Sequence, residues 1–218
     1  MTELTADLIL KAYAYGVFPM AKSREDQTVF WVQPKLRGVL PLDGFHVSRS
    51  LRKVLRHQEF TVTIDRDFAQ VLEGCAETTS ARPDTWINGA IVRLFTELHQ
   101  AGVAHSVEVW QDDRLAGGLY GLAMGGAFFG ESMFSRATNA SKVALCHLVG
   151  LLRVGGFALL DTQFITDHLK RFGAIEISQT EYLGKLSDAL MQRARFGPVL
   201  TQWELDGALF SQRNTQTS

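Results

Sequence analysis

Apolar residues recur along this chain with two different spacings, which together predict its helices and strands. Spacings of three and four positions predict helices, and alternation predicts strands. The expected helices cover Leu8–Tyr13, Arg49–His57, Asp65–Cys75, Ile87–Ala101, Asn139–Val154, Asp167–Phe172 and Glu181–Ala194. The expected strands cover Val29–Val32, Gly38–Leu40, Phe60–Ile64, Ser106–Gln111, Leu115–Ala123, Ala127–Met133 and Phe157–Asp161.

Three of these strands follow one another closely, which predicts an antiparallel meander. The turns Asp112–Arg114 and Met124–Gly126 join them. A long apolar helix and a buried strand come next, so we expect an α+β fold with a mixed central sheet. After His57 the pattern changes to alternating strands and helices, and we place a small N-terminal α/β domain at residues 1–58 and a larger domain at residues 59–218.

The composition is that of an ordinary globular protein. The chain of 218 residues is 46% hydrophobic and carries a formal charge of −1, so any nucleic-acid contact must come from a local basic patch. It has no basic leader-like start and no apolar run of about 20 residues, so a cytoplasmic protein is expected. The residues Thr78–Asp84 are expected to form a polar loop, and Gln212–Ser218 a frayed end.

Motifs for metals, disulfides and nucleotides are missing. Cys75 and Cys146 lie far apart, which predicts neither a disulfide framework nor a zinc site. The six histidines show neither HxxxH nor HxH spacing, so no metal ion is expected. The glycine-rich stretch Gly117–Gly130 predicts a strand hairpin and not a loop that cradles phosphates. No cofactor is therefore expected.

The segment Gly130–Arg136, with the sequence GESMFSR, holds an unusual mixture of side chains. On a regular strand, Glu131, Met133 and Ser135 share one face. A carboxylate beside a methionine suits the wall of an apolar pocket with a few fixed polar groups. An edge strand with its acid in water explains the pattern equally well. The segment also begins like the GxSxG elbow of serine hydrolases, but Phe134 stands where the sharp turn needs glycine.

A second group of polar residues ends an apolar strand at Asp161 and Gln163. The two side chains are two positions apart and can face the same side. A carboxylate that accepts a hydrogen bond from the amide NH₂ would orient the amide and aim its carbonyl oxygen at a substrate. Capping of the following helix by Asp161 or Thr166 is the simpler explanation when this segment is considered alone.

Four basic residues form a third group: Arg49, Arg52, Lys53 and Arg56. Their spacing places them on one face of the expected helix, with no acid among them. In a chain of near-zero net charge, such a stripe indicates contacts with phosphate groups. A solvated helix face is the alternative, and it is the more common of the two.

Together these residues resemble the bacterial leucyl/phenylalanyl-tRNA–protein transferases over Tyr15–Gly197. The shared motifs occur in one order and at consistent spacing, which is far more specific than any single motif. They are YGVFPM at Tyr15–Met20, FW at Phe30–Trp31, HVSRSLR at His46–Arg52, EGCA at Glu73–Ala76, TWI at Thr85–Ile87, AHSVEVW at Ala104–Trp110, GGLYGLAMGGAFFGESMFS at Gly117–Ser135, NASKVAL at Asn139–Leu145, and the DxQ and DH at Asp161–Gln163 and Asp167–His168.

The resemblance implies an activity and a fold. Enzymes of this family transfer Leu or Phe, and less often Met, from aminoacyl-tRNA to the N-terminal amine of a protein that begins with Arg or Lys. This modification marks the protein for degradation. The reaction is aminolysis of an ester and needs neither ATP nor a metal. The implied fold is a small N-terminal domain followed by a domain similar to the GNAT acetyltransferases.

The same resemblance implies roles for individual residues. Gln163 is expected at the attacking amine, Asp161 is expected to orient and polarise it, and Glu131 is expected to bind polar atoms of the aminoacyl-adenosine. The remaining substrate-binding positions are Trp31, Trp86, Leu119, Phe128, Met133 and Ser135. The basic stripe becomes a candidate contact for the tRNA backbone, read without sequence specificity.

Two other functions fit the sequence less closely. The first is a GNAT-type transferase with another donor or acceptor, such as acetyl-CoA or a cell-wall precursor. The absence of a loop-to-helix pyrophosphate site argues against acetyl-CoA. The second is a tRNA-binding protein without catalysis, in which substitution of Asp161 and Gln163 would leave every cellular phenotype intact.

Overall fold

The computed structural model of the protein describes residues 4–26, 28–78 and 83–210. Its helices are α1 (Ala6–Ala14), α2 (Arg49–His57), α3 (Phe68–Ala76), α4 (Gly89–Gln100), α5 (Ala140–Val154), α6 (Asp167–Lys170), α7 (Gln179–Leu190) and α8 (Gln202–Phe210). Its strands are β1 (Phe18–Met20), β2 (Phe30–Val32), β3 (Leu36–Val39), β4 (Thr61–Ile64), β5 (Ala104–Gln111), β6 (Arg114–Met124), β7 (Ala127–Ser135), β8 (Leu159–Gln163) and β9 (Ile175–Ser178).

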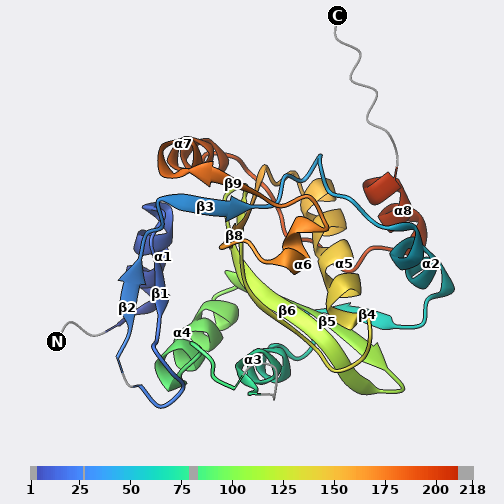
Figure 1. Ribbon diagram of the computed structural model, residues 1–218, viewed down its shortest axis with the longest axis horizontal. Helices are drawn as coiled ribbons and strands as arrows, with labels where there is room; N and C mark the ends of the chain where they lie inside the picture. The colour runs from blue at the N-terminus through green and yellow to red at the C-terminus, as the bar shows by residue number, and fades with distance from the viewer. Residues whose placement is uncertain (1–3, 27, 79–82, 211–218) are drawn as a thin grey trace, which may run out of the picture.

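A seven-stranded sheet organises the fold, with helices on both of its faces (Figure 1). The strand order is β4-β5-β6-β7-β8-β3-β9. Strands β4 to β7 form an antiparallel series, and β8 then joins β7 in parallel after the crossover through α5. A mixed central sheet in an α+β fold is therefore confirmed. No helix in the described part of the chain is long and apolar enough to cross a membrane.

Most of the expected elements are present, with ends that differ by a few residues. Helix α2 has the predicted bounds, because Ser48 caps it by accepting a hydrogen bond from the Leu51 backbone N–H. Strands β1 and β9 and helix α8 were not expected. The two strands are only three and four residues long, and α8 lacks a clear apolar face. The predicted loop Thr78–Asp84 lies partly, and the predicted frayed end Gln212–Ser218 wholly, outside the described residues.

Strands β2 and β3 are consecutive in the chain but do not pair with each other. Strand β2 pairs with β1 in a separate two-stranded sheet, whereas β3 lies between β8 and β9 in the large sheet. Strand β3 precedes the proposed domain boundary at residue 58, and so does α2, which packs against α5. The division of the chain at residue 58 stays a prediction, and β3 carries its N-terminal part into the central sheet.

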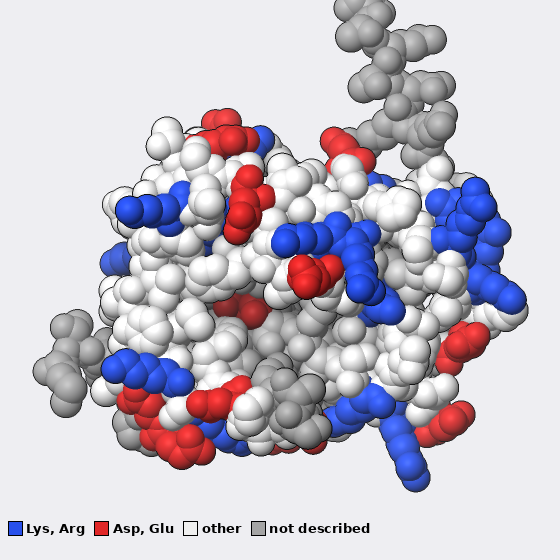
Figure 2. Space-filling model, in the orientation of Figure 1, with Lys and Arg blue, Asp and Glu red and all other residues white. Residues whose placement is uncertain are grey.

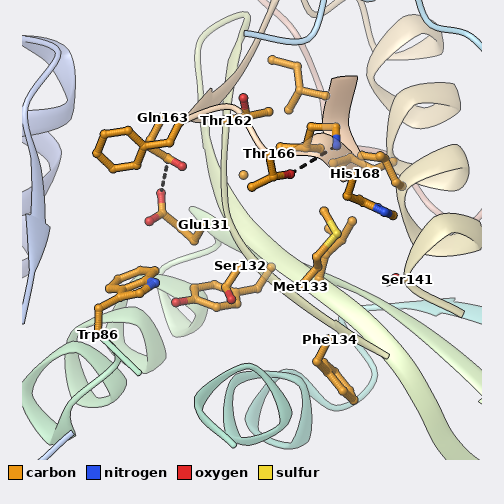
Figure 3. Close-up of a pocket in the computed structure, with 18 of the residues that line it drawn as sticks. Trp86, Glu131, Ser132, Met133, Phe134, Ser141, Thr162, Gln163, Thr166 and His168 are labelled. Carbon is orange, nitrogen blue, oxygen red and sulfur yellow. Dashed lines mark hydrogen bonds between the residues drawn. The ribbon is translucent and has the colours of Figure 1, made fainter. Parts of the chain in front are cut away.

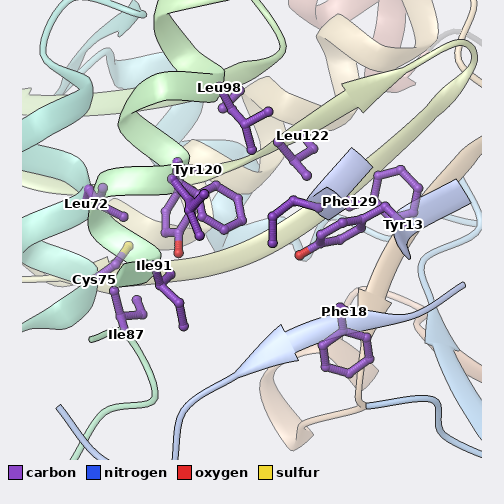
Figure 4. Packing of buried hydrophobic residues seen from close by; sticks show 14 of the residues in the cluster. Tyr13, Phe18, Leu72, Cys75, Ile87, Ile91, Leu98, Tyr120, Leu122 and Phe129 are labelled. Atoms are coloured by element: carbon purple, nitrogen blue, oxygen red, sulfur yellow. The ribbon is translucent and has the colours of Figure 1, made fainter. Parts of the chain in front are cut away.

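Two apolar clusters fill the spaces on the two faces of the sheet. Strand β6 contributes to both, with Tyr120 and Leu122 in one cluster and Leu119 in the other. In the first cluster, the rings of Tyr13 and Phe129 meet edge to face with centroids 5.0 Å apart (Figure 4). Helix α1 is thereby held against β7, which brings the N-terminal residues close to the segment GESMFSR.

Candidate active site

A cavity of about 540 Å³ opens among β1, β7, β8 and α5, in the size range typical of small-molecule sites. It appears as a hollow on the face shown in Figure 2. One side of its wall is apolar and consists of Leu119, Met133, Leu145, Leu148, Leu160 and Leu169. Phe18, Met20 and Trp86 also line the cavity, and Figure 3 shows Trp86 on the same side as the carboxylate of Glu131 and the amide of Gln163. An apolar recess therefore meets two polar groups.

A β-bulge sets the direction of the Glu131 side chain. Tyr120 pairs with Ser132 and Gly121 pairs with Gly130, so Glu131 is an extra residue with no partner across the strand pair. The bulge shifts the alternation of β7 by one position. The expectation that Glu131 shares one face of a regular strand with Met133 and Ser135 is therefore wrong for Glu131, because the bulge interrupts the regular pleat between Gly130 and Ser132. Met133 and Ser135 pair with Leu119 and Gly117 and keep the expected alternation.

A glycine makes room for this bulge. A Cβ atom at Gly121 would collide with the Phe129 carbonyl oxygen and the Phe128 ring. The close approach of β6 and β7 at this point thus requires a residue without a side chain. Bulges next to active sites commonly redirect a side chain, and here the redirected side chain is a nearly buried carboxylate, 9% exposed.

Gln163 lies in a strained turn at the end of β8. Its φ angle is +55°, in the left-handed region that residues other than glycine seldom occupy. The backbone N–H of Phe164 donates to the carbonyl oxygen of Thr162 at 2.6 Å, so Gln163 is the central residue of a γ-turn with positive φ. Such strain is found most often at binding and catalytic sites, where surrounding contacts hold it in place.

The side-chain amide of Gln163 donates from Nε2 to Oε1 of Glu131 at 3.3 Å (Figure 3). The expected hydrogen bond from this amide to Asp161 is not formed. Asp161 accepts instead from the backbone N–H of Gln163, at 2.8 Å from Oδ1. Because the NH₂ group is used on Glu131, the carbonyl oxygen of the amide remains as the acceptor that Gln163 can offer to a ligand.

Asp161 is fully buried and belongs to a network behind the cavity. Arg37 donates to its two oxygens from Nε at 2.9 Å and from Nη2 at 2.7 Å, and Tyr182 donates from its hydroxyl to Oδ2 at 2.7 Å. The guanidinium of Arg37 lies between the rings of Phe18 and Tyr182, 4.5 and 4.6 Å from their centroids. Burial and the charge of Asp161 raise the pKa of Tyr182, so its hydroxyl keeps the proton that it donates.

Burial raises the pKa of Glu131 from 4.5 to about 8. The nearby charge of Asp161 raises this pKa further, while the interaction with the Tyr13 hydroxyl and the charge of Arg37 lower it. Neither the Tyr13 nor the Tyr120 hydroxyl has a hydrogen bond of ordinary geometry within the described residues. Glu131 is therefore a carboxyl group that exchanges a proton near neutral pH, at the wall of an apolar cavity.

Two family models together match most of the chain. The model described as leucyl/phenylalanyl-tRNA protein transferase matches residues 39–187, and the model of the N-terminal domain of the same transferase matches residues 2–35. The chain belongs to the leucyl/phenylalanyl-tRNA–protein transferase family. The resemblance found in the sequence motifs is thus confirmed.

Individual relatives carry the same family name. The chain is 59% identical over 206 residues to a leucyl/phenylalanyl-tRNA–protein transferase of Paramagnetospirillum magneticum. This alignment covers 94% of this chain and 99% of the relative. It is 55% identical over 216 residues to one of a Ruegeria species, which covers 99% of both chains.

Solved structures show more distant similarity. FemX aligns with a TM-score of 0.48 at 12% identity, over 79% of this chain and 66% of FemX. A GCN5-related N-acetyltransferase-like protein from Streptococcus suis aligns with a TM-score of 0.36 at 15% identity, over 79% of this chain and 64% of the other.

The residues expected at the transferase site are only partly brought together. Those that line the cavity are Trp86, Leu119, Glu131, Met133, Ser135 and Gln163. Phe128 is fully buried and does not line the cavity; its ring is stacked on that of Phe196, with the two centroids 5.4 Å apart. Trp31 is 40% exposed on β2 and does not line the cavity either. Asp161 lies behind the wall and contributes through its hydrogen bonds.

The basic stripe on α2 is mostly exposed. Arg49, Lys53 and Arg56 face solvent, and Figure 2 shows basic side chains gathered at the end of the molecule where α2 lies. Arg52 differs from the other three, because its guanidinium lies over the ring of Phe210 at 4.0 Å and its Nε atom is buried. Three of the four residues are therefore free to face a polyanion.

Several residues of the site were not expected from the sequence. Arg37 and Tyr182 hold Asp161, and Tyr13 lies beside Glu131. Arg37 is 124 positions from Asp161, so no local spacing could reveal the pair. The dipeptide Arg37-Gly38 in a short strand is visible in the sequence. Its role can be recognised only once strand β8 is known to be its partner. In the described residues, no three His, Cys, Asp or Glu side chains are grouped as for a metal ion.

The raised pKa of Glu131 makes the stability of the fold depend on pH. The folded state favours the protonated carboxyl group, so this stabilisation is complete below pH 4.5 and is lost as the pH rises through about 8. A difference of one pKa unit between the folded and unfolded states corresponds to about 1.4 kcal/mol of unfolding free energy. The stabilisation lost is therefore on the order of a few kcal/mol. We expect Glu131→Gln to reduce the fall in unfolding free energy between pH 5 and 8.5, measured by urea denaturation.

The matched control is Glu97→Gln on α4, whose side chain is 49% exposed in a surface ion pair with Arg93. This variant should show the wild-type dependence on pH. If the unfolding free energy of Glu131→Gln depends on pH as strongly as that of Glu97→Gln, the raised pKa of Glu131 is refuted.

Proposed function

We propose that this protein transfers Leu or Phe from aminoacyl-tRNA to the N-terminal amine of acceptor proteins that begin with Arg or Lys. Membership of the family supports the reaction class. The observation that carries the proposal is the cavity, in which an apolar recess ends at the Glu131 carboxylate and the Gln163 amide. We place the reaction in the cytoplasm, where aminoacyl-tRNA is made, and its product in the degradation of N-terminally marked proteins.

The apolar wall suits the donor side chain. Leu119, Met133 and Leu148, together with their neighbours, offer only methyl and methylene groups and a thioether to a ligand. An unbranched Cβ lets Leu, Phe or Met extend into such a recess, whereas Ile and Val carry a branch at its entrance. Because one methylene is worth only about 1–3 kcal/mol in an apolar pocket, selectivity among Leu, Phe and Met depends on the shape of the wall.

Glu131 suits the acceptor. An α-ammonium group has a pKa of about 8, and the pKa of Glu131 is also about 8. A proton therefore passes from the ammonium to the carboxylate at little cost in free energy. The neutral amine then attacks the ester carbon. The new C–N bond forms, the bond from this carbon to the ribose oxygen breaks, and the second amine proton passes to that oxygen.

Gln163 suits the orientation of the amine. Its NH₂ group is fixed on Glu131, so its carbonyl oxygen can accept a hydrogen bond from the attacking N–H. Correct orientation of two reactants is a large part of catalysis in a reaction without cofactors. Asp161 takes part in this scheme only by holding the backbone of Gln163.

A transfer assay tests the proposal. Radiolabelled Leu, Phe, Met, Ile and Val are offered on their tRNAs to peptides that begin with Arg, Lys or Met. We expect transfer of Leu or Phe to the Arg and Lys peptides, and little transfer of Ile or Val. We also expect Leu148→Phe to lower transfer of Phe more than that of Leu, because the added ring fills the apolar recess.

Phe128→Leu is the control for the cavity. Its ring is buried outside the lining, so the ratio of Leu to Phe transfer should stay as in the wild type. A wild-type protein that transfers none of the five amino acids would refute the function. A shift of the ratio in Phe128→Leu but not in Leu148→Phe would refute the assignment of the recess.

The exposed residues of α2 are proposed to bind the tRNA backbone. We expect the double variant Arg49→Glu, Lys53→Glu to weaken tRNA binding and to reduce the dependence of log Kd on log salt concentration, because fewer counterions are released. Arg93→Glu on α4, where Arg93 faces Glu97 at 3.8 Å, is the control and should bind tRNA as the wild type does. An unchanged salt dependence in the double variant would show that α2 is only a solvated face.

A further inference from the structure

We propose that Arg37 and Tyr182 are positioning residues for aminoacyl transfer, acting through Asp161 to hold the Gln163 turn against Glu131. The inference rests on the proposed function, because it concerns the same cavity. It changes the role of Asp161, which the family resemblance connects with polarisation of the Gln163 side chain. The geometry makes Asp161 the buried anchor of a turn, with its partners supplied by strand β3 and helix α7.

The carboxylate of Asp161 has no oxygen left for a substrate. Oδ1 accepts from Arg37 Nε and from the backbone N–H of Gln163, at 2.9 and 2.8 Å. Oδ2 accepts from Arg37 Nη2 and from the Tyr182 hydroxyl, both at 2.7 Å. The side chain is fully buried, so neither oxygen reaches the cavity. A carboxylate with this many donors orients its surroundings and does not collect a proton from an amine.

The turn at Gln163 needs such an anchor. A residue other than glycine at a φ of +55° is strained and stays there only when its surroundings hold it. The hydrogen bond from the Gln163 backbone N–H to Asp161 holds one side of the turn. If the carboxylate rotated, the backbone could relax to a common conformation, and the amide of Gln163 would leave Glu131.

Strand β3 supports the turn in a second way. Gly38 follows Arg37 and lies opposite Gln163 in the sheet. A Cβ atom at Gly38 would lie 2.7 Å from the carbonyl carbon of Phe164, so a side chain there would push the turn away. The dipeptide Arg37-Gly38 thus supplies both the cation for Asp161 and the space for the strained backbone.

The N-terminal segment also helps to hold Arg37 in place. Arg37 Nη1 donates to the carbonyl oxygen of Gly16 at 3.0 Å, and Phe18 covers one face of the guanidinium. Gly16 has a φ of +75° and follows α1, while Tyr182 lies against it from α7. Residues 2–35 match the model of the family's N-terminal domain, and Gly16 and Phe18 of this segment contact Arg37 behind the Gln163 turn.

The test compares kcat and the KM for aminoacyl-tRNA in two variants. Tyr182→Phe keeps the ring and removes only one hydrogen bond to Asp161, and we expect it to lower kcat about tenfold. Arg37→Ala removes two donors to Asp161 and the positive charge, and we expect kcat to fall by about 100-fold or more, the size of effect that a small misplacement of a reacting group produces. In both variants the KM should stay near that of the wild type.

Chemical rescue separates positioning from general loss of folding. Guanidinium, added below the concentration that unfolds the protein, should restore part of the kcat of Arg37→Ala by occupying the vacated site. Arg153→Ala is the matched control, because Arg153 also donates to backbone oxygens inside the fold, at Ala208 and Leu42. Guanidinium should not raise the kcat of this control.

A measurement without turnover distinguishes failure of this inference from failure of the proposed function. The NMR signals of the Gln163 side-chain NH₂ group report its contact with Glu131. We expect them to move in Tyr182→Phe and to stay in place in Arg153→Ala. If Tyr182→Phe is folded and leaves both kcat and these signals unchanged, the positioning role is overturned. If these signals move in Tyr182→Phe but the wild-type protein transfers no amino acid, the positioning role is supported and the proposed function is refuted.

Discussion

A guanidinium that is 1% exposed needs a partner, and in this protein the partner is a carboxylate that is wholly buried. Removing either member of such a pair leaves a charge without compensation in a low-dielectric interior, so the two residues constrain one another strongly. Arg37 and Asp161 join strands β3 and β8, and Tyr182 and Phe18 bring helix α7 and strand β1 to the same point. The wall of the cavity is built outward from this ion pair.

The second constraint is the burial of Glu131. The bulge in β7 directs the carboxyl group toward the cavity, and Tyr13, Tyr120 and apolar neighbours keep water away from it. Its pKa is raised mainly by burial and also by the charge of Asp161. We propose that these two neighbouring carboxylates have different tasks. One stays in its ion pair and fixes geometry, and the other exchanges a proton near neutral pH.

Much of the fold could be predicted from the sequence, because its helices and the meander are encoded locally. Ser48 and the apolar face of α2 gave its bounds, and the alternation from Ser106 to Met133 indicated three antiparallel strands. The position of β3 could not be predicted, because its place between β8 and β9 depends on partners more than 120 residues away. Short strands such as β9 carry too little pattern to be recognised alone.

Most residues of the site could be named from the sequence, but their positions and hydrogen bonds could not. Glu131, Gln163, Met133 and Trp86 were expected at the substrate and line the cavity. Phe128 was also expected there but does not line the cavity, because its ring is stacked on Phe196, a residue far along the chain that no local pattern connects with it. The hydrogen bond from the Gln163 backbone N–H to Asp161 was also missed. It occurs in a turn where Gln163 has a positive φ, and the residue types around Gln163 do not predict that conformation.

The titration of Glu131 itself is the most direct test of its role as the proton acceptor. Carbon-13 NMR of protein labelled at the glutamate carboxyl carbons follows each group as the pH changes, and the signal missing in Glu131→Gln identifies the residue. We expect a midpoint at about pH 8. A Glu131 signal that titrates near the ordinary glutamate pKa of about 4.3 would contradict this role, because a carboxylate ionised throughout the neutral range could not share the ammonium proton of the acceptor on equal terms.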